Sequence, residues 1–300
     1  MSVELKSVRL DSGETIGYRQ RSGGEEAVLL LHGNMNSSVH WDVVLERMEA
    51  RYAVYAVDLR GFGTSTYLAP AVRLSDYADD VAAFMEKIGL PRAIVWGWST
   101  GGGVAMELAA RHPERVDRLV LLASVSTRGY PQHENGPDGR PDLSSRLTSA
   151  DGIRADRRNR RILQANEERD KPFMKALFDA VIYERRQPEP QRYEAYLEDI
   201  LTQRNLMDIY EALNAFNISR FDHPAGAGTG AVDLIEAPVL AVRGTEDKVI
   251  SEAMHRELME DFRGRAAEAL LPGCGHSPLI DDPERLLEVV QTFLQEGARA

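Results

Sequence analysis

The sequence is poor in cysteine: Cys274 is the only one among 300 residues. A lone cysteine excludes an internal disulfide and is typical of proteins that fold in a reducing compartment. No run of apolar residues approaches the length of about 18 that a membrane-spanning helix needs. The first residues show no basic segment followed by an apolar stretch, so no secretory signal is predicted. Together, these absences predict a cytoplasmic protein without a membrane partner.

Positive charge is also scarce, with 36 Lys and Arg against 47 Asp and Glu and a net charge of −11. This balance argues against nucleic acid or an anionic membrane surface as a partner. No His, Cys and Asp spacing suggests a metal site, and no phosphate loop or dinucleotide fingerprint is present. We therefore expect no metal and no cofactor. The sequence leaves the oligomeric state open.

What the chain does contain is an alternation of strand and helix patterns. Continuous apolar runs such as 27–31 are typical of strands that are covered on both faces. The expected strands are 3–10, 15–20, 27–31, 53–57, one that begins at 93, 116–122, 238–243 and 267–271, and the expected helices are 41–48, 77–88, 104–111, 252–262 and 283–296. This alternation predicts an α/β protein with a mostly parallel, doubly wound sheet.

The pattern changes between residues 127 and 233, where helical periodicity takes over and no convincing buried strand remains. Helices are expected, for example, at 173–183 and 193–216. We therefore divide the chain into a first part of the core, 1–126, a helical cap inserted at 127–233, and a second part of the core, 234–300. The cap carries a run of arginines at 154, 157, 158, 160 and 161. Acidic neighbours favour a solvated helix face, and the alternative is steering of an anionic substrate.

The segment Gly97-Trp98-Ser99-Thr100-Gly101 joins a predicted buried strand to a predicted helix. The pattern G-x-S-x-G at such a junction is typical of a sharp turn that holds a serine hydroxyl clear of the sheet. The backbone at Ser99 is then expected to be strained, and the helix N-terminus favours negative charge that develops beside it. The five residues alone are a weak signal, but their position between strand and helix makes a nucleophilic serine the favoured interpretation.

A nucleophilic serine needs a base, and the base works best when a carboxylate orients it. Asp247 follows the strand at 238–243, and His276 follows the strand at 267–271 in a glycine-rich loop. Because the carboxyl ends of parallel strands meet at one edge of a sheet, we expect Ser99, Asp247 and His276 to converge. The neighbouring Glu246 is the alternative acid.

Two backbone N–H groups should stabilise the oxyanion of the reaction. One is expected from Thr100, and the other from Asn34, with Met35 as the second choice. His32 is interpreted as a residue that braces the loop before Asn34. Met35 and Trp98 are candidates for contact with the substrate, although Trp98 fits equally well behind the turn. We place His40 and His255 on or beside surface helices.

Taken together, these segments resemble the α/β-hydrolase fold superfamily. The segments that carry the resemblance are His32-Gly33-Asn34, Asp58-Leu59-Arg60-Gly61-Phe62-Gly63-Thr64-Ser65, Gly97-Trp98-Ser99-Thr100-Gly101, Gly244-Thr245-Glu246-Asp247 and Gly275-His276. The resemblance covers the whole chain, with the cap matching in position only. It implies Ser99 as nucleophile, Asp247 as acid and His276 as base. Serine at position 99 disfavours the epoxide hydrolases and haloalkane dehalogenases, which carry an aspartate there.

Within the serine branch, residues 34–38 together with Gly97-Trp98-Ser99 are locally similar to intracellular short-chain polyhydroxyalkanoate depolymerases. The function expected from the whole is hydrolysis of a small carboxylic ester through an acyl-enzyme. Alternatives on the same three residues are hydrolysis of a C–C bond, an amide or a polyester. A further alternative is a ligand-sensing protein that keeps the fold but turns over slowly.

Overall fold

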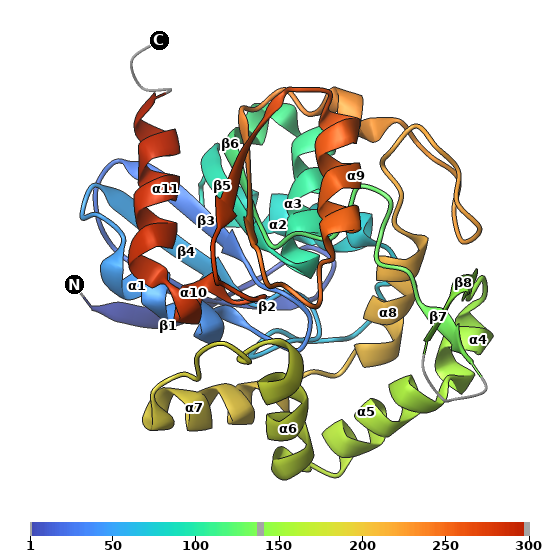
Figure 1. The fold of residues 1–300 in the computed structure, drawn as a ribbon. Coiled ribbons are helices and arrows are strands. Elements are labelled where there is room, and N and C mark those ends of the chain that lie inside the picture. The colour runs from blue at the N-terminus through green and yellow to red at the C-terminus, as the bar shows by residue number, and fades with distance from the viewer. Residues whose placement is uncertain (1, 137–140, 297–300) are drawn as a thin grey trace.

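In the computed structural model, which describes residues 2–136 and 141–296, an eight-stranded sheet forms the centre of the molecule (Figure 1). Across the sheet, the strands are β1 (Val3–Arg9), β2 (Thr15–Arg21), β4 (Tyr52–Val57), β3 (Glu26–Leu31), β5 (Ala93–Trp98), β6 (Val116–Leu122), β9 (Val239–Gly244) and β10 (Ala266–Leu271). β2 pairs antiparallel with β1 and with β4, and every pair from β4 to β10 is parallel. The predicted mostly parallel α/β sheet is confirmed.

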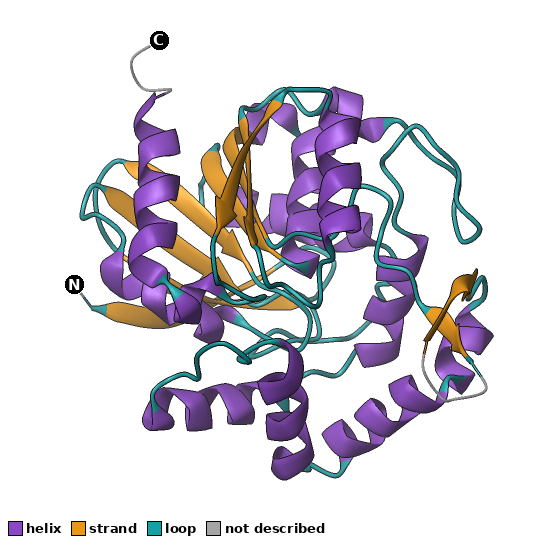
Figure 2. Ribbon diagram, viewed as in Figure 1, coloured by secondary structure: helices purple, strands orange, loops and turns teal. Residues whose placement is uncertain are grey.

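Helices cover both faces of this sheet (Figure 2). One face carries α1 (Asp42–Arg47) and α11 (Pro283–Glu296), and the other carries α2 (Leu74–Lys87), α3 (Thr100–Arg111) and α9 (Glu252–Phe262). Consecutive side chains of β3 alternate between two buried clusters, with Leu29 and Leu31 in one and Val28 and Leu30 in the other. A continuous apolar run is therefore what a strand buried on both faces requires.

The segment between β6 and β9 leaves the sheet and forms a separate layer of helices at the carboxyl ends of the strands (Figure 1). Its elements are β7 (His133–Asn135), β8 (Pro141–Arg146), α4 (Ala150–Ala155), α5 (Arg157–Glu167), α6 (Lys171–Val181), α7 (Pro190–Ile200), α8 (Leu206–Ala215) and the 3₁₀ turn η3 (Ala231–Leu234). The small hairpin of β7 and β8 was not predicted. The cap boundaries at 127 and 233 remain a prediction, and residues 297–300 of the second core part lie outside the described residues.

The helix predicted at 193–216 is wrong as a single element, because α7 and α8 are separated by residues 201–205. Residues of this break form hydrogen bonds with residues 60–63 in the turn after β4. Thr202 Oγ1 accepts from Gly63 N at 3.0 Å, and Arg204 N donates to the carbonyl oxygen of Gly61 at 2.9 Å. Asn205 Nδ2 donates to the carbonyl oxygen of Arg60 at 2.9 Å. Tertiary hydrogen bonds thus replace the helical ones that the local pattern favoured.

Within the described ranges, every helix is too short or too polar to cross a membrane.

Candidate active site

The turn between β5 and α3 has the strained geometry that its glycines permit. Ser99 has φ 55° and ψ −117°, a region that residues with a side chain rarely adopt. A Cβ on Gly97 would lie 2.3 Å from the carbonyl oxygen of Gly101, and a Cβ on Gly101 would lie 2.1 Å from that of Leu31. Only glycine fits at either position. The pattern G-x-S-x-G is therefore a steric requirement of this turn.

Asp247 and His276 meet at the carboxyl ends of β9 and β10. His276 Nδ1 lies 3.0 Å from Oδ2 and 3.1 Å from Oδ1 of Asp247, whose side chain is completely buried. The carboxylate is itself fixed, because Oδ1 accepts from the backbone N–H groups of Val249 at 2.8 Å and Ile250 at 2.9 Å. A carboxylate at Nδ1 holds the proton there and leaves Nε2 as a base. The side chain of Glu246, by contrast, is exposed.

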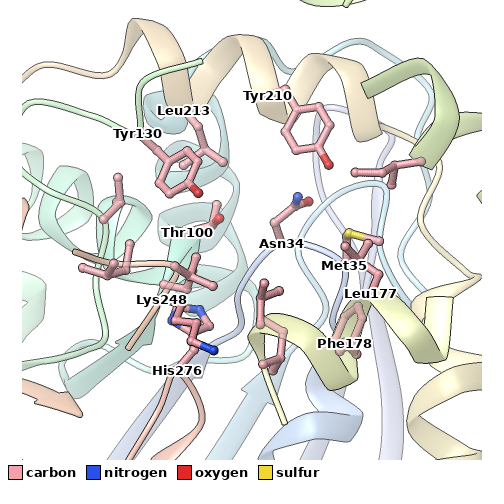
Figure 3. Close-up of a pocket in the computed structure, with 17 residues that line it drawn as sticks. Asn34, Met35, Thr100, Tyr130, Leu177, Phe178, Tyr210, Leu213, Lys248 and His276 are labelled. Carbon is pink, nitrogen blue, oxygen red and sulfur yellow. The ribbon is translucent and has the colours of Figure 1, made fainter. Parts of the chain in front are cut away.

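Ser99 and His276 line one cavity of about 250 Å³ between the sheet and the cap (Figure 3). Most of the apolar side chains that line it come from the cap. The cap residues that line it are Tyr130, Ile162, Leu177, Phe178, Val181, Ile182, Tyr210 and Leu213. Among the described lining residues, Lys248 carries the one permanent charge, and it is ion-paired with the nearly buried Glu184. The pocket is therefore suited to an uncharged, apolar group next to Ser99.

Backbone N–H groups gather beside Ser99 from two directions. Thr100 is the first residue of α3, where an N–H has no partner within the helix. The loop after β3 passes close to the serine, since a Cβ on Gly33 would lie 3.2 Å from Ser99 Cβ. Asn34 and Met35 of this loop both line the cavity, and Met35 adopts φ 59°. The residues of all three predicted donors line the cavity that contains Ser99.

His32 braces this loop from within the core, as its interpretation required. Its Nδ1 donates to the carbonyl oxygen of Gly33 at 2.7 Å, and its Nε2 accepts from Leu59 N at 3.0 Å. Burial lowers the pKa of His32 to about 4. Because both nitrogens are engaged and the ring stays neutral, His32 is excluded as a second base.

Trp98 does not line the cavity, which corrects its assignment as a substrate contact. Its side chain is 2 % exposed, and its Nε1 donates to the carbonyl oxygen of His276 at 3.0 Å. Side chains alternate along β5, and Trp96 and Trp98 both point to the face that carries α1 and α11, where they pack edge-on against Trp41. The indole supports the His276 loop from behind.

His255 lies on α9 and His40 lies directly before α1, which are helices that cover the sheet, but neither side chain is at the surface. Both side chains are buried, His40 under the cap and His255 beside β10, where its Nε2 lies 2.9 Å from Glu268 Oε1. His40 contacts Tyr183 and Asp199, more than 140 residues away. No local sequence signal reports such partners. Within residues 2–136 and 141–296, no group of three or more His, Cys, Asp or Glu side chains is placed to hold a metal ion.

A family model described as the alpha/beta hydrolase fold matches residues 26–283. The chain belongs to this family. The predicted membership of the superfamily is thus confirmed, while the local similarity to polyhydroxyalkanoate depolymerases stays a prediction.

Among curated proteins, the chain is 29% identical over 271 residues to a pimeloyl-[acyl-carrier protein] methyl ester esterase from Nitrosomonas europaea, covering 89% of this chain and 95% of that protein. It is 28% identical over 284 residues to the esterase of the same name from Pectobacterium carotovorum, covering 94% and 99%. Among solved structures, an esterase from Exiguobacterium antarcticum superposes with a TM-score of 0.75 at 19% identity, covering 96% of this chain and 98% of the other. That likeness shows the fold.

Proposed function

We propose that this chain is a carboxylic ester hydrolase that works through an acyl-enzyme on Ser99. The observation that carries the proposal is the buried Asp247–His276 pair, which opens into the same cavity as the strained Ser99. The curated relatives are methyl ester esterases, which supports an ester as the substrate. A cytoplasmic location, with the small-molecule substrate as the expected partner, belongs to the same proposal.

In this mechanism, Ser99 Oγ attacks the ester carbonyl carbon while His276 Nε2 takes its proton. Asp247 stabilises the imidazolium that forms. The oxyanion accepts hydrogen bonds from the N–H of Thr100 and from that of Asn34 or Met35, near the positive end of α3. Collapse breaks the bond to the alcohol oxygen, which receives the proton from His276. His276 then activates water, and attack on the acyl-enzyme releases the acid and restores Ser99.

The cavity sets the kind of acyl group that this site would take. Its volume of about 250 Å³ and its apolar walls favour a short to medium aliphatic or aromatic acyl chain. Because most of the apolar lining side chains come from the 127–233 cap, we assign chain-length preference to the cap.

A second candidate function is hydrolysis of an ester on an acyl chain attached to an acyl-carrier protein, as the names of the relatives indicate for those proteins. One observation favours it: Arg157, Arg158 and Arg161 line a surface groove that shares Ile162 and Leu177 with the cavity. Substrate steering by these arginines requires kcat/KM for a carboxylate-bearing ester to fall with ionic strength while that for a neutral ester stays constant. If both stay constant, the arginines form a solvated helix face.

The experiment that tests the main proposal is a p-nitrophenyl ester series from acetate to dodecanoate with wild type, Ser99→Ala and His276→Ala. We expect multiple turnover in the wild type and a loss of about 10⁴-fold or more in each variant, because the residues act as a unit. Activity that survives Ser99→Ala refutes the mechanism. Little turnover in the wild type would direct attention to C–C, amide or polyester substrates, or to slow ligand sensing.

A further inference from the structure

A buried polar cluster lies beneath the 34–37 loop, and the mechanism above does not use it. Its members are Asn36, Ser37, His40, Tyr183 and Asp199, with side chains between 0 % and 7 % exposed. Ser37 Oγ donates to Asp199 Oδ1 at 2.5 Å, and His40 Nε2 lies 3.4 Å from Asp199 Oδ2. Asp199 is in the last turn of α7, so the cap supplies the carboxyl group of a cluster that otherwise belongs largely to the core.

The cluster is bonded to the loop's backbone through Asn36. With its amide nitrogen toward the loop, Asn36 donates to the carbonyl oxygens of Asn34 at 2.5 Å and Met35 at 3.1 Å, and its oxygen accepts from His40 Nδ1 at 3.2 Å. The proton on Nδ1 leaves Nε2 of His40 as an acceptor. Nε2 and Asp199 Oδ2 lie 3.4 Å apart, and neither atom has a hydrogen-bond partner among the described residues, which favours a protonated carboxyl group facing a neutral imidazole. Burial supports this neutral pair, because it raises the pKa of Asp199 to about 7 and lowers that of His40 to about 3.

Gln203 makes a second connection from the cap to the same loop. Its Nε2 donates to Asn34 Oδ1 at 2.8 Å and to Asn205 Oδ1 at 3.0 Å. Figure 3 shows the Asn34 side chain in the cavity near Tyr210. Both cap contacts are remote in sequence, since 162 residues separate Ser37 from Asp199 and 169 separate Asn34 from Gln203.

Because of peptide geometry, these contacts fix the directions of the backbone N–H groups that would bind the oxyanion. A peptide group is planar, so a hydrogen bond to the carbonyl oxygen of one residue fixes the direction of the N–H of the next. His32 fixes the plane that contains the Asn34 N–H, because it bonds the carbonyl oxygen of Gly33. Asn36 fixes the plane that contains the Met35 N–H in the same way. The first plane is held by the core, and the second is held by a cluster that Asp199 completes.

We propose that the end of α7 and the break that follows it set the oxyanion hole, with Asp199 and Gln203 as positioning residues for the 34–37 loop. The strained φ of Met35 requires such support, since a residue with a side chain keeps that conformation only when its surroundings enforce it. The inference rests on the proposed function, in which this loop supplies an oxyanion N–H. It adds that the hole is complete only when the cap is docked on the core.

The test compares Asp199→Ala and Gln203→Ala with two controls. Asp199→Asn is the conservative variant, because its oxygen still accepts from Ser37 and its amide nitrogen donates to His40. Glu198→Gln changes the neighbouring exposed residue of α7, which is ion-paired with Lys171. With p-nitrophenyl butyrate, we expect the two alanine variants to lose about tenfold or more in kcat with KM within about twofold, since loss of a whole oxyanion donor costs about 10²–10³. Both controls should stay near wild type.

Inhibitor affinity separates positioning from general damage. A trifluoromethyl ketone forms an oxyanion on the serine, whereas the methyl ketone of the same length binds without one. The alanine variants should lose affinity for the first by the same factor as kcat and keep their affinity for the second. Equal changes in both, or a KM rise at constant kcat, would overturn the proposal. If Asp199→Ala does not melt cooperatively, it is not folded, and the kinetics and inhibitor affinities of Gln203→Ala then decide whether the proposal holds. Failure of the proposed function is distinct, because activity would then survive Ser99→Ala.

Discussion

Replacing Asp199 by Asn should change how the stability of the protein depends on pH. Burial raises the pKa of Asp199 to about 7, whereas an unfolded aspartate titrates near 3.9. Between these values the folded protein still holds a proton on Asp199 that the unfolded chain has lost, so the contribution of Asp199 to the free energy of unfolding falls as pH rises. The buried His40 makes the opposite contribution below about pH 6.5, and it does so in both proteins. Three pKa units at about 1.4 kcal/mol each give a loss of up to about 4 kcal/mol between pH 4 and 7. The asparagine variant lacks this loss.

Urea unfolding of wild type and Asp199→Asn at intervals from pH 5 to pH 8 measures the difference directly. The other charged or titratable groups that act on Asp199 are Arg19, His40, Asp58 and Tyr183, and they are present in both proteins. We expect the free energy of unfolding of the variant, relative to that of the wild type, to rise by about 1.4 kcal/mol for each pH unit up to pH 7. Above pH 7 the difference should stay constant. Parallel stability curves would mean that Asp199 loses its proton near its ordinary pKa in the folded protein, and would refute the protonated Asp199.

Three further outcomes follow from the site. In p-nitrophenyl ester kinetics, Asp247→Asn should lower kcat by about 10³-fold or more, whereas kcat of Glu246→Gln should stay within about threefold of the wild type. The reverse order would assign the role of the acid to Glu246. Lys248→Gln removes the ion-pair partner of the nearly buried Glu184, so the free energy of unfolding measured in urea should fall by about 1–2 kcal/mol. No change would mean that water solvates the Glu184 carboxylate as well as Lys248 pairs with it. Ile162→Phe narrows the cavity, and kcat/KM should fall more for the octanoate than for the acetate ester; an equal fall in both would place Ile162 outside the acyl path.

The sheet and the predicted triad positions could be derived from sequence because their signals are local. Apolar runs of five or six residues mark strands buried on both faces, and glycine marks turns where the backbone approaches too closely for a side chain. Asp247 follows such a strand, β9, and His276 follows the neighbouring edge strand β10, so their convergence required only the parallel sheet. Trp98 was ambiguous, because the sequence does not show which face of the sheet its side chain joins. The alternation of side chains along β5 in the structure places it on the face that carries α1 and α11.

The cap could not be derived in the same way, because its structure depends on contacts that the local sequence does not contain. Residues 201–205 have a helical pattern, yet they give up helical hydrogen bonds for contacts with the turn after β4. His40 looked like a surface residue because its partners Tyr183 and Asp199 come from distant parts of the chain. Local periodicity predicts the face of an element that is buried, but not the element that buries it.

These long-range contacts distinguish two groups of cap helices with different roles. α5, α6 and α8 supply cavity walls, so changes there act on the acyl chain. α7 is tied to the core, since Arg192 bonds Asp42 at 3.0 Å and Glu46 at 2.9 Å, and Tyr196 donates to Asp42 at 2.5 Å. An element held this firmly is suited to fix a catalytic loop rather than to admit substrate. Substitutions that widen or narrow the walls should therefore change which ester is preferred, whereas substitutions at the end of α7 should slow every ester by a similar factor.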